Sequence, residues 1–327
     1  MEQSKKPTIR DVAREAGVSI SVVSYVLNQT PGKTIRQETK KRVINAAEKL
    51  HYVPDRFASG MRTKRAKSIG IVSHWRIDSD LFVQFLRGVE RVTSQNGYSV
   101  MLCNLKDRKD TSYIDHYLDR RVDGILFISP YDAIDETEEQ IHISCMQQAG
   151  VPFSVINGHT NLPDINRADF DFYGSAYLAT EYLIKKGHRQ ITYVAPVFDT
   201  YAEFSERKRG YAAAMAAHGL AQDYCPADQI AARIEDFCAV VANKSDTAHR
   251  IICEAHRRGL RIPERFALIA ANTERYSSFL FPPLTTVSMQ ADTVSEVACK
   301  LLMDTILGTQ KKRAVVVPCV LTERDSC

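Results

Sequence analysis

Near the start of the chain, apolar residues recur at helical spacing in two short segments. Within residues 8–28, Val12 and Ala16 lie four positions apart, and so do Val23 and Leu27. A spacing of four places two side chains on the same face of an α-helix. The pattern therefore predicts two short amphipathic helices whose apolar faces pack against each other.

Polar residues and a glycine mark the ends of these two helices. Thr8 can cap the first helix, and Asp11 suits the positive end of its dipole. Gly17 supplies the turn, and Ser19 can cap the second helix. The pattern is typical of a helix-turn-helix, in which the start of the second helix meets base edges in the major groove of DNA. The residues predicted to point outward from the second helix are Ile20, Ser21, Val22 and Tyr25.

A third helix is predicted after the first two. Thr34 and Gln37 fit a capping box. Apolar residues then recur at helical spacing and would close a small three-helix core; they are Val43, Ala46, Ala47 and Leu50. Taken alone, residues 8–28 could equally form an ordinary helical hairpin at the protein surface.

From Ser68 onward, short apolar runs alternate with amphipathic stretches, which is typical of parallel strands joined by helices. The first series of predicted strands is Ile69–Ser73, Val100–Leu105, Ile125–Ser129 and Phe153–Asn157. The second series is Ile191–Ala195, Ala239–Asn243 and Phe266–Asn272. Helices are predicted near 81–96, 111–120, 137–149, 173–186, 203–218 and 246–258.

The two series predict an α/β fold with two similar lobes, each a parallel sheet with flanking helices. The strings at 282–289 and 315–321 would return the chain across the seam, and a helix at 291–307 would complete the pair of lobes. Ligands of such sheets bind outside the carboxyl ends of the strands. We therefore expect a cleft lined by residues that directly follow the strands.

Charge separates the N-terminal segment from the rest of the chain. Residues 1–67 hold 15 Lys and Arg but six Asp and Glu, a net charge of +9. The whole chain carries +4, so the remaining residues carry −5. A basic segment that also carries a helix-turn-helix pattern favours double-stranded DNA as its partner.

Several other classes of protein are disfavoured. The polar start gives no sign of a signal peptide, and no apolar run approaches the ~18 residues of a membrane span, so a cytoplasmic protein is expected. The eight cysteines contain no C-x-x-C pair, which favours reduced core thiols over disulfides or a metal site. Dinucleotide, phosphate-loop, esterase and zinc-protease motifs are absent. Hence we predict no catalytic residue, no cofactor and no metal.

The order of several strings resembles the lactose-repressor (LacI/GalR) family of bacterial transcription regulators. In the N-terminal segment these are TIRDVAREAGVS, VVSYVLN, HYVPDRFASGM and SIGIV. Further along they are RRVDGILFIS, YLIKKGHRQITYVAP, ERKRGYAAAM, RRGLRIPERFALI and PPLTTVSMQ. The resemblance implies a homodimer, two DNA-binding heads on a pseudo-palindromic operator, and a small effector between two lobes like those of periplasmic binding proteins. It divides the chain into a helix-turn-helix domain at 1–53, a hinge at 54–67 and an effector-binding domain at 68–327.

The same resemblance assigns residues to DNA recognition. It places base contacts at Ile20, Ser21 and Tyr25, where the last replaces the usual arginine of the family. An arginine can fork onto guanine O6 and N7, whereas tyrosine offers one hydroxyl. Met61 stands where the family usually has a leucine wedge that opens a central base step; an exposed linker methionine is the alternative. The residues expected to contact phosphate are Arg10, Asn28 and Thr34.

The resemblance also assigns residues to the effector cleft. Arg207 matches the family arginine that binds the effector, and the alternative is one more basic residue on a charged helix. Phe82 matches a wall position of the cleft. Three asparagines end three predicted strands on the cleft side, namely Asn157, Asn243 and Asn272.

These asparagines bear on the charge of the ligand. Where sugar-binding relatives often carry aspartates, this chain has Asn157, Asn272 and Lys244. A cleft with fewer carboxylates costs less to occupy with a buried anion. We therefore expect a sugar acid, a phosphorylated sugar or a similar anion, with a neutral sugar or nucleoside as the alternative. Acidic residues that could restore the negative charge are Asp80, Glu203 and Glu206.

Two functions of other classes are weighed against a DNA-binding regulator. A ligand-binding receptor without a DNA role is disfavoured by the basic N-terminal segment. An α/β enzyme with an accessory DNA-like domain is disfavoured because no catalytic motif is found. The pattern as a whole favours a repressor controlled by a small molecule.

Overall fold

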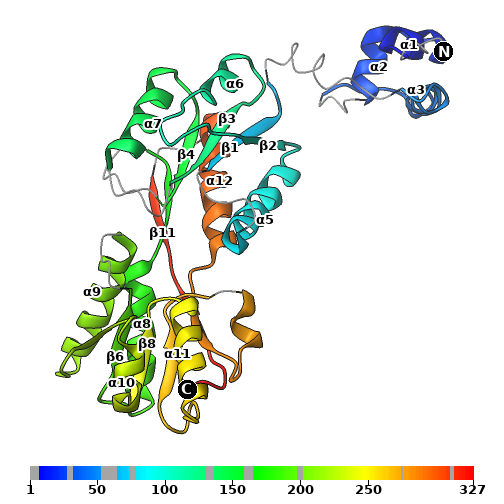
Figure 1. The fold of residues 1–327 in the computed structure, drawn as a ribbon. Helices are drawn as coiled ribbons and strands as arrows, with labels where there is room; N and C mark the ends of the chain where they lie inside the picture. The colour runs from blue at the N-terminus through cyan, green and yellow to red at the C-terminus, as the bar shows by residue number, and fades with distance from the viewer. Residues whose placement is uncertain are drawn as a thin grey trace. The chain divides into compact units, whose positions relative to one another are not determined.

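The computed structural model describes residues 7–27, 32–52, 65–73, 79–129, 136–157, 165–196, 202–273, 275–309 and 313–327. The chain forms two compact units, residues 1–66 and 67–327, which Figure 1 colours from blue to red along the chain. Two of the residues predicted to contact DNA, Asn28 and Met61, lie outside the described residues, and so does most of the predicted hinge.

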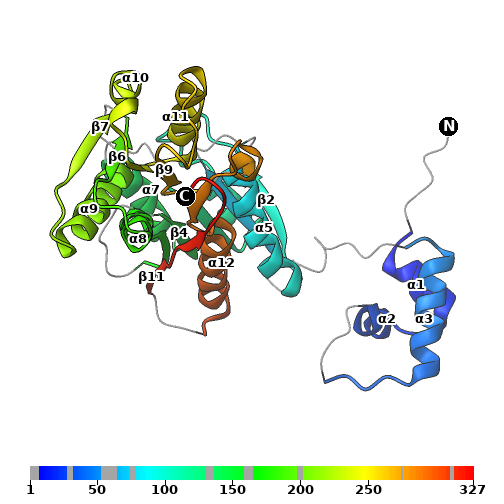
Figure 2. The same cartoon turned by 90° about the horizontal axis from the view of Figure 1, so that it is seen from below.

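The N-terminal unit contains the predicted helices α1, α2 and α3, which Figure 2 shows beside one another. Their bounds are Ile9–Ala16, Ile20–Leu27 and Gln37–Lys49. All of these helices contribute to one small apolar core, which consists of Val12, Ala13, Ala16, Val23, Val26, Val43, Ala46 and Ala47. The helical spacing in the sequence thus predicts the core correctly, with Leu27 and Leu50 packed at its edge.

The polar ends of the first two helices are confirmed. The Asp11 carboxylate accepts hydrogen bonds from the backbone N–H of Thr8 at 2.9 Å and from the Thr8 hydroxyl at 2.7 Å. Gly17 has a φ of +61°, which favours glycine over residues with a side chain. The Ser19 hydroxyl accepts a hydrogen bond from the N–H of Val22 at 3.3 Å.

Two local predictions in this unit are wrong. The capping box of Thr34 and Gln37 does not form, because Gln37 is itself the first residue of α3 and Arg36 precedes it without a side-chain cap. Val22 does not point fully outward but packs half-buried at the edge of the core.

The second unit contains two sheets, each of six strands among the residues described. The first runs β11-β5-β4-β3-β1-β2, and its strands are β1 Ser68–Ser73, β2 Ser99–Cys103, β3 Gly124–Ile128, β4 Phe153–Ile156, β5 Arg167–Phe170 and β11 Ala314–Val317. The second runs β12-β10-β9-β8-β6-β7, and its strands are β6 Thr192–Ala195, β7 Asp223–Pro226, β8 Ala239–Ala242, β9 Ala267–Ala270, β10 Thr285–Ser288 and β12 Val320–Thr322. All neighbouring strands are parallel except β10 and β12.

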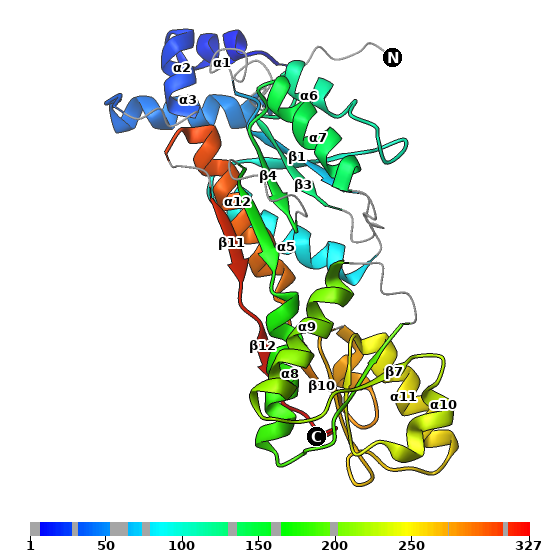
Figure 3. The same ribbon diagram turned by 90° about the vertical axis from the view of Figure 1, so that its left-hand side faces the viewer.

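Helices cover both faces of each sheet, so the strands are buried on two sides (Figure 3). On the first sheet, α5 and α12 pack on one face and α6 and α7 on the other; their bounds are Asp80–Gln95, Ala291–Leu307, Ile114–Leu118 and Glu136–Gln148. On the second sheet, α8 and α9 pack on one face and α10, η1 and α11 on the other; their bounds are Phe172–Lys185, Ala202–Ala217, Ile230–Arg233, Ile234–Asp236 and Ser245–Arg257. The short helix η2, Arg275–Phe279, follows β9.

The predicted strands and helices are present within a few residues of their predicted bounds, so the α/β fold with two lobes is confirmed. The strands β5 and β7 escaped prediction because each is four residues long and begins with a charged side chain, as in RADF and DYCP. The chain passes between the lobes after β5, after β10 and after β11. The last two passages confirm that the strings at 282–289 and 315–321 carry the chain across the seam.

The eight cysteines are free thiols, as predicted. Burial raises the pKa of Cys299 to about 12, so this thiol stays protonated and uncharged. The prediction of core positions is wrong for Cys238 and Cys253, which are exposed just before β8 and on the outer side of α11. Over the described ranges, no helix is long and apolar enough to cross a membrane, and no cluster of three or more His, Cys, Asp and Glu could hold a metal ion.

Candidate DNA-reading head and effector pocket

The helix α2 has one buried face and one outward face. Val23 and Val26 are buried in the small core, whereas Ser21 is exposed. Tyr25 lies one helical turn after Ser21, so the two side chains share the outward face, and Tyr25 is half-buried. Ile20, at the first turn of the helix, is 45% exposed, which is high for an isoleucine. The three residues assigned to base contacts are therefore all accessible from outside the head.

Tyr25 carries a cation on its ring. The ammonium of Lys33 lies 5.5 Å from the centre of the Tyr25 ring, which is within the range of a cation–π contact. Lys33 belongs to the segment between α2 and α3 and is exposed. The sequence gives no periodic signal for this contact, since Lys33 lies outside any helix.

Other basic side chains of the head are also exposed. The predicted phosphate contacts Arg10 and Thr34 both lie at the surface. The further exposed cations of the described part of this unit, besides Lys33, are Arg14, Arg36, Lys40, Lys41, Arg42 and Lys49. Such side chains can neutralise phosphates without reading sequence.

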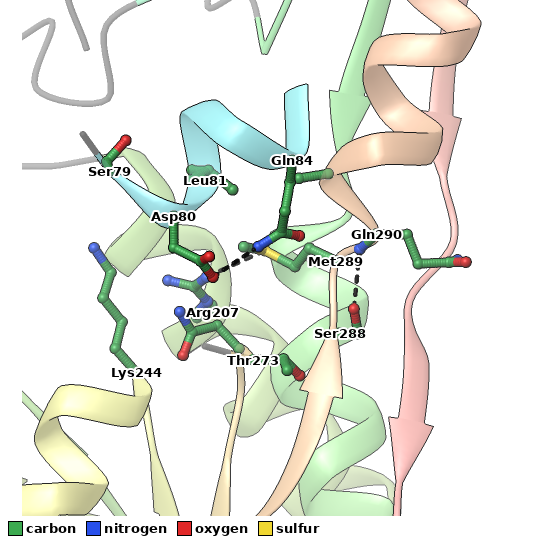
Figure 4. Close-up of a pocket in the computed structure, with 12 residues that line it drawn as sticks. Ser79, Asp80, Leu81, Gln84, Arg207, Lys244, Thr273, Ser288, Met289 and Gln290 are labelled. Atoms are coloured by element: carbon green, nitrogen blue, oxygen red, sulfur yellow. Dashed lines mark hydrogen bonds between the residues drawn. The ribbon is translucent and has the colours of Figure 1, made fainter. Parts of the chain in front are cut away.

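In the second unit, a pocket of about 160 Å³ collects residues from both lobes and from the segment between them. The first lobe contributes Asp80 and Gln84 at the start of α5, and the second contributes Arg207 of α9 (Figure 4). Met289 lies on the passage from β10 to α12. A ligand in this pocket would therefore touch both lobes and the chain that links them.

Arg207 is the largest wholly buried side chain among the described residues, with an exposed fraction of 0%. Its Nε donates to the Ser175 hydroxyl at 3.4 Å, and one terminal nitrogen lies 3.2 Å from the sulfur of Met289. The guanidinium carbon lies 5.0 Å from the centre of the Phe172 ring. Its contacts therefore reach the passage after β5 through Phe172 and the passage after β10 through Met289. The alternative of a surface basic residue on a charged helix does not fit this burial.

In the described part of the lining, the charged side chains are two cations and one carboxylate: Arg207, Lys244 and Asp80. Lys244 directly precedes α11 and lines the pocket from the second lobe (Figure 4). The Asp80 carboxylate accepts a hydrogen bond from Gln84 Nε2 at 3.2 Å. Glu206 is 40% exposed and pairs with Arg209 outside this pocket. Among the described lining residues, the two cations therefore outnumber the one carboxylate.

The structure does not bring the three strand-end asparagines together. Asn272 lines the pocket, and its side-chain oxygen also accepts a hydrogen bond from the N–H of Ser245 at 2.6 Å, at the start of α11. Asn157 and Asn243 are buried at the ends of β4 and β8, outside the residues that line the pocket. Within the described residues, neither of their side-chain nitrogens has a hydrogen-bond partner.

Phe82 is also separated from Arg207. It is 2% exposed, packs in the core of the first lobe and lines a second hollow of about 520 Å³ at the ends of β1 and β2. The sequence reasoning did not single out Gln84 or the residues Ser288–Gln290, which line the pocket with Arg207. Ser288–Gln290 belong to the string PPLTTVSMQ, which the sequence marks as a passage between the lobes and as part of the family resemblance but not as a ligand site.

Comparisons with known proteins find a separate match for each of the two units. A family model described as "Bacterial regulatory proteins, lacI family" matches residues 8–55, and one described as "Periplasmic binding protein-like domain" matches residues 180–327. The HTH-type transcriptional repressor PurR of Pasteurella multocida (strain Pm70) is 29% identical over 325 residues, which cover 94% of this chain and 95% of the relative.

Solved structures extend the likeness to the whole chain. A complex of the transcriptional regulator CelR with cellobiose matches with a TM-score of 0.66 at 25% identity, covering 98% of this chain and 100% of that one. The lac repressor dimer bound to operator and the anti-inducer ONPF matches with a TM-score of 0.79 at 21% identity, covering 98% and 99%. The second likeness establishes the fold.

Proposed function

We propose, from the premise that this chain belongs to the lacI family of bacterial regulatory proteins, that it is a sequence-specific repressor whose affinity for a DNA operator is set by a small effector. The observation that carries the proposal is the outward face of α2, where Ile20, Ser21 and Tyr25 are accessible on a basic head. The curated relative reported above is named as a transcriptional repressor, which favours a regulator over an enzyme or a receptor without a DNA role.

A homodimer is part of this proposal. A pseudo-palindromic operator needs two heads related by a two-fold axis. Phe279, the last residue of η2, and Phe281, two residues later, are 82% and 91% exposed. Large aromatic side chains at this exposure are typical of a surface that a partner covers. We assign that partner to a second copy of the chain.

A mobility-shift assay tests DNA binding. The full chain should bind operators selected from random DNA, and its affinity should fall by a factor of about 10³ or more between roughly 50 and 200 mM salt, because six or more phosphate contacts release counterions. A chain of residues 68–327 is the control, since it lacks the head but keeps both lobes. It should sediment as a dimer and bind no DNA. Operator binding by the shortened chain would contradict the proposal.

The effector is proposed to be a small anion such as a sugar acid or a phosphorylated sugar. Among the described lining residues, the positive charges of Arg207 and Lys244 exceed the negative charge of Asp80. A guanidinium can bind a carboxylate or phosphate through two parallel hydrogen bonds. The volume of about 160 Å³ lies below the ~300–1,000 Å³ of pockets for drug-sized ligands, which favours a ligand of monosaccharide size. A neutral sugar or nucleoside is the second candidate, because Asp80 can accept hydrogen bonds from hydroxyl groups.

Calorimetry with paired ligands decides between these candidates. Each pair consists of a sugar and its phosphate or its acid, so that the two members share the sugar ring and differ at one anionic group. The anionic member should bind about tenfold tighter or better, since each of the two charge-assisted hydrogen bonds to a guanidinium exceeds a neutral one by roughly 1 kcal/mol. If only the neutral members bind, the effector is not an anion.

A further inference from the structure

Lys33 and Tyr25 form a contact between a cation and an aromatic ring in the N-terminal unit, the proposed DNA-binding head. Lys33 is exposed, and among the described residues no carboxylate lies within salt-bridge distance of its ammonium. Its ammonium instead lies 5.5 Å from the centre of the Tyr25 ring. Because Tyr25 and Ser21 share the outward face of α2, Lys33 presents its charge on the same side of the head as the reading face.

The ring and the ammonium complement each other chemically. Tyrosine has one hydroxyl and no positive charge, so Tyr25 alone cannot replace a forked donor aimed at guanine O6 and N7. Lysine carries three N–H donors and makes that contact with guanine. A free lysine side chain, however, samples many rotamers before it reaches a base. A position on the Tyr25 ring reduces that freedom, because the ring face attracts the cation.

We propose that Lys33, held on the ring of Tyr25, is a specificity-determining residue of the head and donates to a guanine in each operator half-site. The pair Tyr25 and Lys33 then does jointly what one arginine does elsewhere, with the ring as support and the ammonium as donor. The inference rests on the proposed function, since it assumes that the outward face of α2 enters the major groove. A lysine that contacted phosphate instead would raise affinity for every DNA sequence alike.

Operator selection from random DNA tests the proposal with the full chain and its Lys33→Met variant. The parent chain should select a G·C pair at one position of each half-site. Lys33→Met keeps the apolar stem but removes the donors, so it should lose that preference and bind the selected operator about tenfold or more weakly. Its affinity for random DNA should change far less, and Lys33→Arg should restore the guanine preference.

Variants of Tyr25 show whether the ring holds the lysine. Tyr25→Phe keeps the ring and should retain the guanine preference, whereas Tyr25→Leu should lose it at the same base position as Lys33→Met. At that base position, the double variant Tyr25→Leu/Lys33→Met should be no less selective than either single variant. Both substitutions remove the same interaction, so their effects should not add. Circular dichroism and thermal melting confirm that the head of each variant is folded.

Lys41→Met is the matched control, since Lys41 is an exposed lysine of the same unit away from this contact. It should lower affinity for selected and random DNA by the same factor and leave base preference unchanged. The proposal is overturned if Lys33→Met behaves like this control, or if Lys33→Met and Tyr25→Leu alter different base positions. A parent chain that selects no sequence at all would overturn the proposed function itself, and this inference with it.

Discussion

Replacing Arg207 with methionine is expected to abolish effector binding at millimolar ligand while the second lobe stays folded. The Arg207 guanidinium is wholly buried and lines the pocket. An anion bound there loses water molecules and gains charge-assisted hydrogen bonds to this guanidinium. Loss of one partner of such a buried charged pair costs about 2–5 kcal/mol, or roughly 30-fold or more in affinity. Methionine fits the space between Phe172 and Met289 because its unbranched thioether adapts to irregular apolar surroundings.

Calorimetry with the anion that the parent chain binds measures this loss. Arg209→Met serves as control, because Arg209 lies on the same helix but is exposed and paired with Glu206. The control should bind the anion as the parent does, and both variants should keep operator affinity in the absence of effector. Unchanged binding by Arg207→Met would remove Arg207 from the effector site.

The structure explains why the small head was predictable in detail. Its core consists of residues three or four positions apart on short helices, and its helix ends are set by Thr8 with Asp11, by Gly17 and by Ser19. All of these signals are local in the sequence. The failed capping box at Gln37 has a local cause too, since the helix starts there, at most two residues away from the predicted position.

The lining of the proposed effector pocket was less predictable, because it depends on contacts between distant segments. The rule that ligands bind beyond the carboxyl ends of strands predicted Asn157, Asn243 and Asn272 at the carboxyl ends of their strands, where the structure has them. Only Asn272 reaches the pocket with Arg207, since the passage after β10 brings Met289 to the centre instead. No periodicity of the sequence reports which strand end faces the other lobe, so the match to the family carried the assignment of Arg207.

The close packing of Gly210 against α8 leads to a prediction about how Arg207 is held in place. It lies on α9, one turn after Arg207, where that helix crosses α8. A methyl group at Gly210 would lie well inside van der Waals contact with the carbonyl oxygen of Tyr173, 3.0 Å from its carbonyl carbon and 3.1 Å from the backbone nitrogen of Tyr177. These are backbone atoms of α8, so no side-chain rotation can relieve the clash.

We therefore expect Gly210→Ala to destabilise the second lobe and weaken effector binding together. Helix propensity alone would make alanine more stable than glycine by about 1 kcal/mol. Overpacking against a rigid backbone opposes this with a cost of about 1–3 kcal/mol or more, and α9 must move away from α8. That movement separates Arg207 from the Ser175 hydroxyl, which now accepts its Nε–H at 3.4 Å. Thermal melting should show a lower midpoint, and calorimetry should show weaker anion binding. Ala216→Val, on the exposed side of α9, should change neither, and a rise in the melting midpoint of Gly210→Ala would mean that the two helices do not cross this closely.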